Sequence, residues 1–321
     1  MNKARKIVLS PVLGTLASIL MAGCSPVPDM SGIAAERQRP VHRYDIAQAV
    51  ASNGKVVVVG TQDGAALVSV DQGKRWQRTA LGNASLVDIA TCGDQGFVAV
   101  DHYHKVWSAD ADGANWQSVP LELPRTPLTV TCDKQGGWWV AGTNAVIAGS
   151  HDQGKTWLNT DLGEDTQITS LQFLDDKKAI ALGEFGLTVF SEDGGATWKK
   201  GAKIPGDFYP YAALFANRSE GWVSGIAGQI MHTTDGGKSW QKQANTAHAS
   251  LYRLFLHDGV PFGVGSGGVI ARLDGTTWRV QPYTDPLPVF LGGGASLPGQ
   301  SAVVIGGPGG LLRAVSTVAK Q

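Results

Sequence analysis

One octet, Ser/Thr-x-Asp-x-Gly-x-x-Trp, returns four times with little change: SVDQGKRW at 69–76, SHDQGKTW at 150–157, SEDGGATW at 191–198 and TTDGGKSW at 233–240. Looser copies end at Trp116 and Trp278. The six tryptophans that close these copies are spaced by 40, 41, 41, 42 and 38 residues. Self-similarity at one fixed period indicates a stack or ring of a single supersecondary unit.

A second signal has the same period. Glycine-rich hairpins, each flanked by two apolar strands, are centred near residues 62, 102, 143, 184, 226, 266 and 307. Another apolar strand precedes each hairpin, and a further strand begins at the tryptophan. Four short strands per repeat of about 40 residues are typical of a propeller. We therefore predict an all-β fold, a seven-bladed β-propeller of four-stranded antiparallel blades. The length alone would also allow two domains, but a repeat architecture predicts one.

The seventh unit has no tryptophan and no predicted fourth strand after Val315. Because an unpaired strand edge is a liability, we expect another segment to cover it. Residues 37–43 precede the first full unit. We predict that they form an N-terminal strand on the outside of blade 7 and close the ring.

The octet is the motif known as the Asp-box, and each of its residues suits a folding role. The Asp accepts backbone N–H bonds across a turn, the Gly takes a positive φ, and the Trp buries a large ring. We predict a structural turn between the third and fourth strands. Its residues are Asp71, Gly73, Trp76, Asp110, Gly113, Trp116, Asp152, Gly154, Trp157, Asp193, Gly195, Trp198, Asp235, Gly237, Trp240 and Trp278.

The N-terminus has the pattern of an export signal. Lys3, Arg5 and Lys6 precede a short apolar stretch, and Leu20–Cys24 resembles a bacterial lipobox in which Met21 replaces the usual Leu. The expected organisation is a signal peptide at 1–23, a lipidated tether at 24–40 with Cys24 lipidated, and a single propeller at 41–321. Ser25 favours a periplasmic protein anchored to the outer membrane. An ordinary secretory signal is the alternative.

Cys92 and Cys132 lie 40 residues apart, close to one repeat. The two cysteines are therefore expected at similar points of neighbouring blades. Export is compatible with a disulfide between them, and two buried free thiols are the alternative.

Composition and motifs exclude several functions. The 27 basic and 27 acidic side chains leave no net charge, so we expect no nucleic-acid partner. We find no phosphate-binding loop, metal-binding cysteine pair or nucleophile elbow, so neither a cofactor nor an enzyme is expected. A sialidase, which carries the same boxes, would need an arginine triad and a paired Tyr and Glu, and its usual motif is absent. His102 and His104 form a weak candidate metal pair on one hairpin.

Seven units with SxDGGxTW boxes, each following a glycine-rich hairpin, resemble the propeller family of photosystem II assembly and stability factors. The resemblance covers roughly residues 41–316. It implies a non-catalytic scaffold that binds folding membrane proteins and helps a complex to assemble. The expected partner is therefore a membrane or envelope protein complex. A glycan-binding or sialidase-like propeller, and an accessory lipoprotein of an export or outer-membrane assembly machine, are the alternatives.

Aromatic and basic side chains on the connecting segments suggest a partner-binding rim, because such residues are enriched in protein interfaces. Blade packing is the competing explanation. The predicted rim residues are Tyr103, Arg125, Phe185, Phe208, Tyr209 and Tyr283. Asp45, Asp88 and Arg253 precede apolar residues of three innermost strands, and we expect them to form a polar band near the channel or to pair with one another.

Overall fold

The computed structural model describes residues 29–318 of the chain. Contacts divide the chain into two units, Met1–Gln38 and Arg39–Gln321. The described part of the first unit is helix α1 (Ser31–Gln38), which lies within the predicted tether. None of the described helices is both long and apolar enough to cross a membrane. Cys24, the predicted lipidation site, lies outside the described residues.

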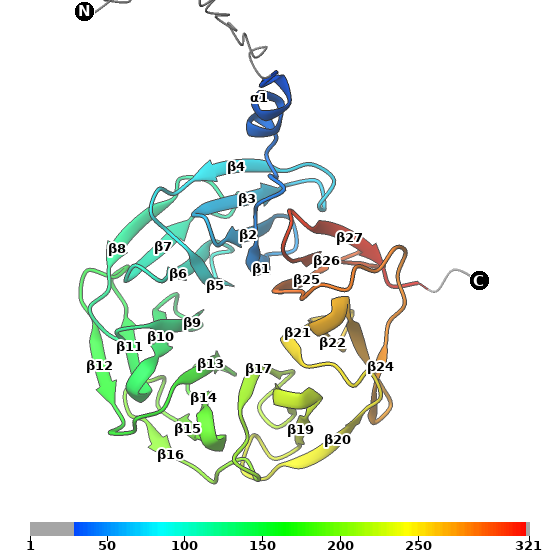
Figure 1. Ribbon diagram of the computed structural model, residues 1–321. Coiled ribbons are helices and arrows are strands. Elements are labelled where there is room, and N and C mark those ends of the chain that lie inside the picture. Colours follow the sequence, from blue (N-terminus) through cyan, green and yellow to red (C-terminus); the bar gives the residue numbers. More distant parts are fainter. Residues whose placement is uncertain (1–28, 319–321) are drawn as a thin grey trace, which may run out of the picture. The chain divides into compact units, whose positions relative to one another are not determined.

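The second unit is a ring of antiparallel sheets, with one blade for each repeat (Figure 1). The innermost strands are β1 (Ala47–Ser52), β5 (Leu86–Thr91), β9 (Pro127–Cys132), β13 (Ile168–Phe173), β17 (Pro210–Phe215), β21 (Leu251–His257) and β25 (Gly293–Leu297). The second strands are β2 (Val57–Thr61), β6 (Phe97–Asp101), β10 (Trp138–Gly142), β14 (Ala179–Gly183), β18 (Gly221–Gly225), β22 (Val260–Gly265) and β26 (Ala302–Gly306).

The third strands are β3 (Ala65–Ser69), β7 (Lys105–Ala109), β11 (Val146–Ser150), β15 (Thr188–Ser191), β19 (Ile230–Thr233), β23 (Ile270–Asp274) and β27 (Leu312–Ser316). The fourth strands are β4 (Gln77–Ala80), β8 (Gln117–Pro120), β12 (Leu158–Asp161), β16 (Lys199–Lys200), β20 (Gln241–Asn245) and β24 (Thr277–Val280). The predicted all-β, seven-bladed propeller is confirmed.

The core lies between neighbouring blades. The second strand of a blade has another sheet on each side, so it reads as a run of apolar residues that is buried throughout, as in β6 and β14. The box tryptophans pack across to the preceding blade. Trp240 of blade 5, for example, lies in one cluster with Ile180 and Leu182 of blade 4. A lone blade would expose both of these faces, so the blades are stable only as a ring.

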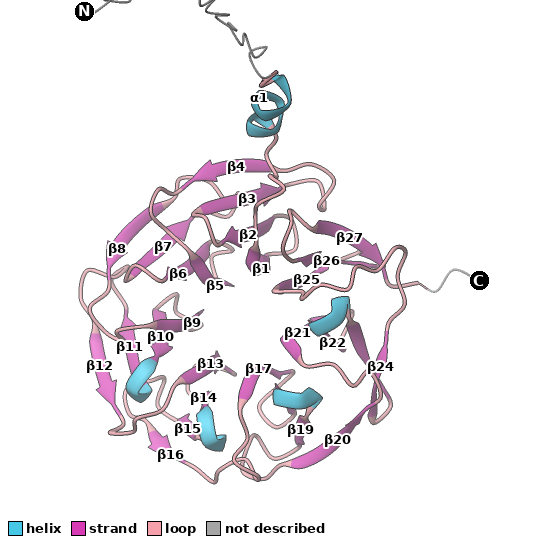
Figure 2. Ribbon diagram, viewed as in Figure 1, coloured by secondary structure: helices cyan, strands magenta, loops and turns pink. Residues whose placement is uncertain are grey.

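Because the strands of a blade alternate in direction, its turns fall on two opposite faces of the ring. We call one the hairpin face. It carries the hairpins between second and third strands and the connections from blade to blade. In blades 3 to 6 each hairpin holds a short 3-10 turn, η1 (Thr143–Ala145), η2 (Glu184–Gly186), η3 (Ile226–Gly228) or η4 (Ser266–Gly268) (Figure 2). The opposite face, which carries the Asp-boxes, is the box face.

Each regular box is held by the same hydrogen bonds. In blade 3 the Asp152 carboxylate accepts from the Thr156 N–H (2.9 Å) and the Thr156 hydroxyl (2.7 Å), while the Ser150 hydroxyl oxygen accepts from the Gly154 N–H (2.8 Å). The bond from the Thr156 hydroxyl, above all, lowers the pKa of Asp152 to about 2. The box is therefore a turn closed by a carboxylate, and all its donors come from within the octet.

The structure adds one feature of the ring that the sequence did not predict and decides one that the sequence left open. The outer strands of blades 5 and 6 pair in parallel, with Ala244 opposite Thr277, so the two blades share one sheet of eight strands. Cys92 and Cys132 form a disulfide with a Cα–Cα distance of 5.2 Å. Whether these cysteines were bridged or free had been left open. The bridge joins the box-face ends of two neighbouring innermost strands.

The prediction of a closing strand from residues 37–43 is wrong. Arg37 and Gln38 belong to α1, and the described residues give blade 7 only the three strands β25, β26 and β27. Residues 39–46 instead form a turn, because the Asp45 N–H bonds to the His42 C=O (3.0 Å) and the His42 N–H to the Asp45 carboxylate (2.7 Å). These bonds occupy the backbone groups that a strand would need.

The ring is closed by this turn and by β1. The Gly310 N–H of blade 7 donates to the Asp45 C=O (2.9 Å), and the Ala47 N–H donates to the Gly307 C=O (3.1 Å). Arg78 Nη1 of blade 1 donates to both oxygens of the buried Asp45 carboxylate, Oδ1 at 3.0 Å and Oδ2 at 2.9 Å. We call this junction of blades 7 and 1 the seam.

Candidate functional site

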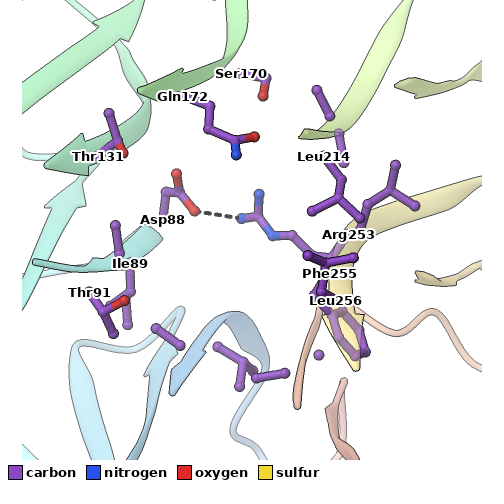
Figure 3. A pocket seen from close by; sticks show the side chains of 18 of the residues that line it. Asp88, Ile89, Thr91, Thr131, Ser170, Gln172, Leu214, Arg253, Phe255 and Leu256 are labelled. Atoms are coloured by element: carbon purple, nitrogen blue, oxygen red, sulfur yellow. Dashed lines mark ion pairs between the residues drawn. The ribbon is translucent and has the colours of Figure 1, made fainter. Parts of the chain in front are cut away.

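The centre of the ring holds a cavity of about 720 Å³ lined by all seven innermost strands. Its walls come from the later residues of those strands and from the turn at Asp258 and Gly259, so it occupies the box-face half of the channel. Hydroxyl groups of Thr131 and Ser170 alternate in the lining with apolar side chains such as Leu214 (Figure 3). The lining of the cavity therefore mixes polar and apolar side chains.

Arg253 reaches across this channel from blade 6 to blade 2 (Figure 3). Its Nη2 donates to the Val87 C=O (2.9 Å) and lies 3.4 Å from the Asp88 carboxylate. Asp88 in turn accepts the Val130 N–H of blade 3 (3.0 Å). The charge of Arg253 is thus compensated inside the channel, and the three residues tie three blades together.

Asp45 does not join this polar band. It is buried at the seam, where it is paired with Arg78, and it does not line the channel. The expectation therefore holds for the Asp88–Arg253 pair, and it is wrong for Asp45.

On the hairpin face, three tyrosines lie in a row at the channel mouth. The ring centres of Tyr209 and Tyr211 are 6.3 Å apart, and those of Tyr211 and Tyr252 are 5.2 Å apart, both edge to face. The Tyr209 hydroxyl donates to Glu184 of the η2 turn (2.5 Å), and this bond raises the pKa of Tyr209 to about 12. Glu184 also accepts the Gln167 N–H (2.9 Å). We call Tyr209, Tyr211 and Tyr252 the tyrosine row.

Phe185, next to Glu184, has an unusual backbone conformation. The middle residues of the four 3-10 turns all have positive φ: Asn144 (58°), Phe185 (56°), Ala227 (56°) and Gly267 (66°). Gly and Asn suit this region, whereas a bulky side chain there is strained. Nevertheless, Phe185 is 49% exposed. The other three turns have small or polar residues at this position, so a half-exposed aromatic residue in this conformation is an outlier, and such outliers point to function.

The other predicted rim residues separate into three groups. Tyr103 is 58% exposed and Arg125 is also exposed, so both are accessible on the hairpin face. Tyr283 is half-buried, and its hydroxyl donates to the Gly268 C=O (2.7 Å). Phe208 is only 2% exposed and packs in the core between blades 4 and 5, so its assignment to the rim is wrong. The sequence could not separate it from the neighbouring Tyr209.

The two histidines of the weak metal candidate are exposed on the hairpin of blade 2. His104 has a φ of 59° and its C=O accepts the Leu121 N–H (2.8 Å), just as Gly64 accepts the Leu81 N–H in blade 1. It is therefore a turn residue. Within residues 29–318 no group of three or more His, Cys, Asp or Glu side chains is arranged to hold a metal ion.

Comparison with known proteins points to one family. Two overlapping segments, 108–217 and 161–250, match the family described as photosynthesis system II assembly factor YCF48. The photosystem II assembly lipoprotein Ycf48 of a Synechococcus species is 28% identical over 151 residues, which are 45% of this chain and 44% of that protein. The chloroplast photosystem II stability/assembly factor HCF136 of Arabidopsis thaliana is 24% identical over 243 residues, 65% of this chain and 59% of that protein. The chain spans about half the length of these curated relatives.

Solved structures agree on the fold. YCF48 from Cyanidioschyzon merolae and a YCF48 bound to a D1 peptide are 17% and 16% identical, both with a TM-score of 0.68, and cover 86% and 88% of this chain and 97% and 96% of theirs. An inactive virginiamycin B lyase from Staphylococcus aureus is 14% identical with a TM-score of 0.73 and covers 86% of this chain and 96% of its own. At such identities the likeness concerns the fold only.

The matched segment holds blades 3 to 5 and, with them, Phe185, Glu184 and two tyrosines of the row. The family match and the curated relatives show that this part of the chain is similar to photosystem II assembly and stability factors, and the YCF48 structures share its propeller fold.

Proposed function

We propose that this protein is a non-catalytic scaffold in the periplasm that binds a membrane or envelope protein complex and assists its assembly or stability. The relatives are named as assembly and stability factors, and one YCF48 structure is described as bound to a D1 peptide. The observation that carries the proposal here is the strained, exposed Phe185 beside the tyrosine row. Exposed aromatics on a fixed backbone are typical anchors of protein interfaces.

The binding surface in this proposal is the part of the hairpin face over blades 4 to 6. Phe185 inserts into the partner, and the Glu184–Tyr209 hydrogen bond fixes the turn that presents it. Ile226, 52% exposed on the neighbouring η3 turn, extends the apolar surface. Tyr103 and Arg125 of the predicted rim lie over blades 2 and 3 and serve as peripheral contacts.

A purely binding role agrees with the chemistry of the channel. Catalysis needs groups whose charge or hydrogen bonds are free to act on a substrate. Here Asp88 is held by Arg253 and by the Val130 N–H. The likeness to virginiamycin B lyase is a likeness of fold, and fold does not decide function.

A photo-crosslinking amino acid placed at position 185 of the full-length chain tests the binding surface in cells. The control places the same group at Leu158, which is 63% exposed on the outer strand of blade 3. We expect one defined membrane protein to crosslink from position 185 and not from 158, and to be lost when Tyr209→Phe is added. Equal products from both positions, or retention on a glycan array instead, would contradict the proposal.

The anchor is tested separately. Curated relatives are named as lipoproteins, which supports lipidation at Cys24 and attachment to a membrane, with the outer membrane expected from Ser25. Cys24→Ala should move the protein from the membrane fraction to the soluble fraction. Mass spectrometry of the N-terminal peptide of the unchanged protein should find a lipid on Cys24. An unmodified Cys24 in the membrane fraction would contradict the anchor.

A further inference from the structure

Blade 7 differs from the other six blades in its outer edge. In blades 1 to 6 the third strand pairs with a fourth strand, as β3 does with β4. The described residues contain no strand that pairs with the outer side of β27. An unpaired strand edge is a template for another extended chain.

The register shows which backbone groups this edge presents. The Thr317 N–H bonds to the Ser301 C=O (2.8 Å), and the Leu311 C=O accepts the Gly307 N–H (2.9 Å), so residues 311 and 317 face β26. Because both backbone groups of a residue in an antiparallel strand point to the same side, and successive residues alternate, Arg313 and Val315 also face inward. Leu312, Ala314 and Ser316 therefore present their N–H and C=O groups outward.

The side chains beside this edge are basic. Val315 packs with Phe262 and Ile270 of blade 6, so the odd-numbered side chains of β27, including Arg313, face the gap between blades 6 and 7. Arg272 lies opposite Phe262 and therefore faces the same gap. Within the described residues neither Arg272 nor Arg313 forms an ion pair with a carboxylate, and Arg313 Nη1 donates to the Asp285 C=O (3.0 Å). Arg279 and Asp274 lie on the same side of blade 6 as Arg272 and pair with each other (3.1 Å), so a net positive charge remains.

Comparison with blade 1 shows why Arg272 is exposed. The equivalent third-strand residue of blade 1 is Val68, and it lies against the box glycine of blade 2, Gly113. In the described residues blade 7 has no box to place over blade 6. Val68 of blade 1 and Phe190 of blade 4 lie against a box glycine of the next blade, and the exposed Arg272 holds the same position in blade 6.

We propose that the open edge of β27 binds an extended, acidic polypeptide segment, which completes blade 7 as its fourth strand. The backbone pairing selects an extended chain, and Arg272 and Arg313 select acidic side chains on the blade 6 side. Residues 39–46 of this chain are held at the seam and do not occupy the site. The proposal rests on the proposed function, because it names the kind of segment that the client protein supplies.

The probe is a ten-residue peptide, blocked at both ends, in which glutamate alternates with valine and threonine. One comparison peptide has lysine in place of glutamate, and another keeps glutamate but has N-methylated backbone amides. With the complete chain purified in detergent, we expect the acidic peptide to bind at least tenfold more tightly than either. The variant R272E/R313E should reverse the charge preference, while K242E, on the outer strand of blade 5, should not.

Hydrogen exchange then locates the peptide. The amides of Leu312, Ala314 and Ser316 should exchange at least tenfold more slowly when it binds, and those of Arg313 and Val315, already bonded to β26, should change little. Ala314→Pro removes one outward donor at an edge position where proline is tolerated, and should weaken binding at least fivefold.

Three results would overturn the proposal: equal binding of the N-methylated peptide, unchanged binding by Ala314→Pro, or a dimer of the peptide-free chain that Ala314→Pro dissociates. The last would assign the edge to a second copy. These outcomes are separate from those at position 185. A client that crosslinks there while the peptide fails at β27 leaves the proposed function standing, and the reverse result leaves the edge site standing.

Discussion

The two faces of the ring differ in how closely their turns repeat from blade to blade. On the box face the same hydrogen bonds recur from blade to blade, and each box uses donors from its own octet. On the hairpin face the equivalent turns carry Asn144, Phe185, Ala227 and Gly267 at one backbone position. Repetition therefore marks the parts that hold the ring together, and departures from it mark candidate sites.

The seam tests this comparison most strongly, because its residues are not repeated in the other blades and yet they hold the ring closed. Asp45→Ala removes the buried acceptor of the His42 N–H and one of the two carboxylates, Asp45 and Asp63, that pair with Arg78 among the described residues. Because removing one partner of a buried ion pair is strongly destabilising, we expect a loss of about 3–5 kcal/mol in the free energy of unfolding, measured in urea. Arg75→Ala, in an ion pair whose Arg75 is 89% exposed, is the control and should change little. Similar losses in both variants would show that Asp45 does not close the ring.

Gly195→Ala tests the box face. A Cβ at Gly195 would lie 2.1 Å from the Trp139 ring of the preceding blade, and the residue has a φ of +91°. Overpacking and a strained φ together should cost about 3 kcal/mol. Gly163→Ala is a matched control, because its φ is +66° but nothing lies within 4 Å of the added carbon. It should cost about 1 kcal/mol, and an equal loss in both would mean that the fit against Trp139 contributes nothing.

Acid should weaken the box face selectively. The hydrogen bonds of the boxes lower the pKa of Asp71, Asp152 and Asp235 to about 2, below the value of about 3.9 in an unfolded chain. The stability that these carboxylates contribute is complete above pH 4 and is lost as the pH falls toward 2. In thermal melts, Asp152→Asn should differ from the unchanged protein most at pH 5 and least at pH 2. A difference that stays constant with pH would contradict this role.

Phe185→Gly should have the smallest effect on stability of these variants. That result would separate the hairpin face, where Phe185 serves binding, from the box face, where the repeated residues serve folding. The substitution relieves a strained φ and removes a half-exposed ring, so the free energy of unfolding should change by less than about 0.5 kcal/mol. To test binding in this variant, the photo-crosslinking amino acid is placed at position 226 instead of 185. We expect the client protein to crosslink from position 226 when Phe185 is present and not in Phe185→Gly. A large loss of stability would instead make Phe185 a folding residue, like those of the boxes.

The repeats were enough to predict the fold, because one octet fixes a turn, a strand and a buried ring at every copy. The closing segment could not be predicted in the same way. Its turn depends on Asp45 bonding its own neighbour His42, and this local bond competes with strand pairing.

The site was predicted in part for a related reason. Phe208 and Tyr209 are adjacent aromatics on one connection, and only the packing of blade 4 decides which of them is buried. Asp88 and Arg253 are each the third residue of an innermost strand, so the repeat predicted that both lie near the channel. The repeat did not show that Arg253 of blade 6 reaches across the channel to blade 2, because that depends on which blades face each other in the ring. Tyr252 was missed because its sequence reads as an innermost strand, and Tyr211 was not among the predicted rim residues although it lies on the same connection as Tyr209. Their offset by one repeat period was the available signal.

The seam also constrains the order in which the chain folds. Most contacts of the ring join neighbouring repeats, whereas the bond from Ala47 to Gly307 joins residues 260 positions apart. Contacts so distant in sequence form slowly, since a long loop must close before they contribute. The seven blades can therefore assemble as an open arc, and we expect the meeting of blades 7 and 1 at the seam to be the last step of folding.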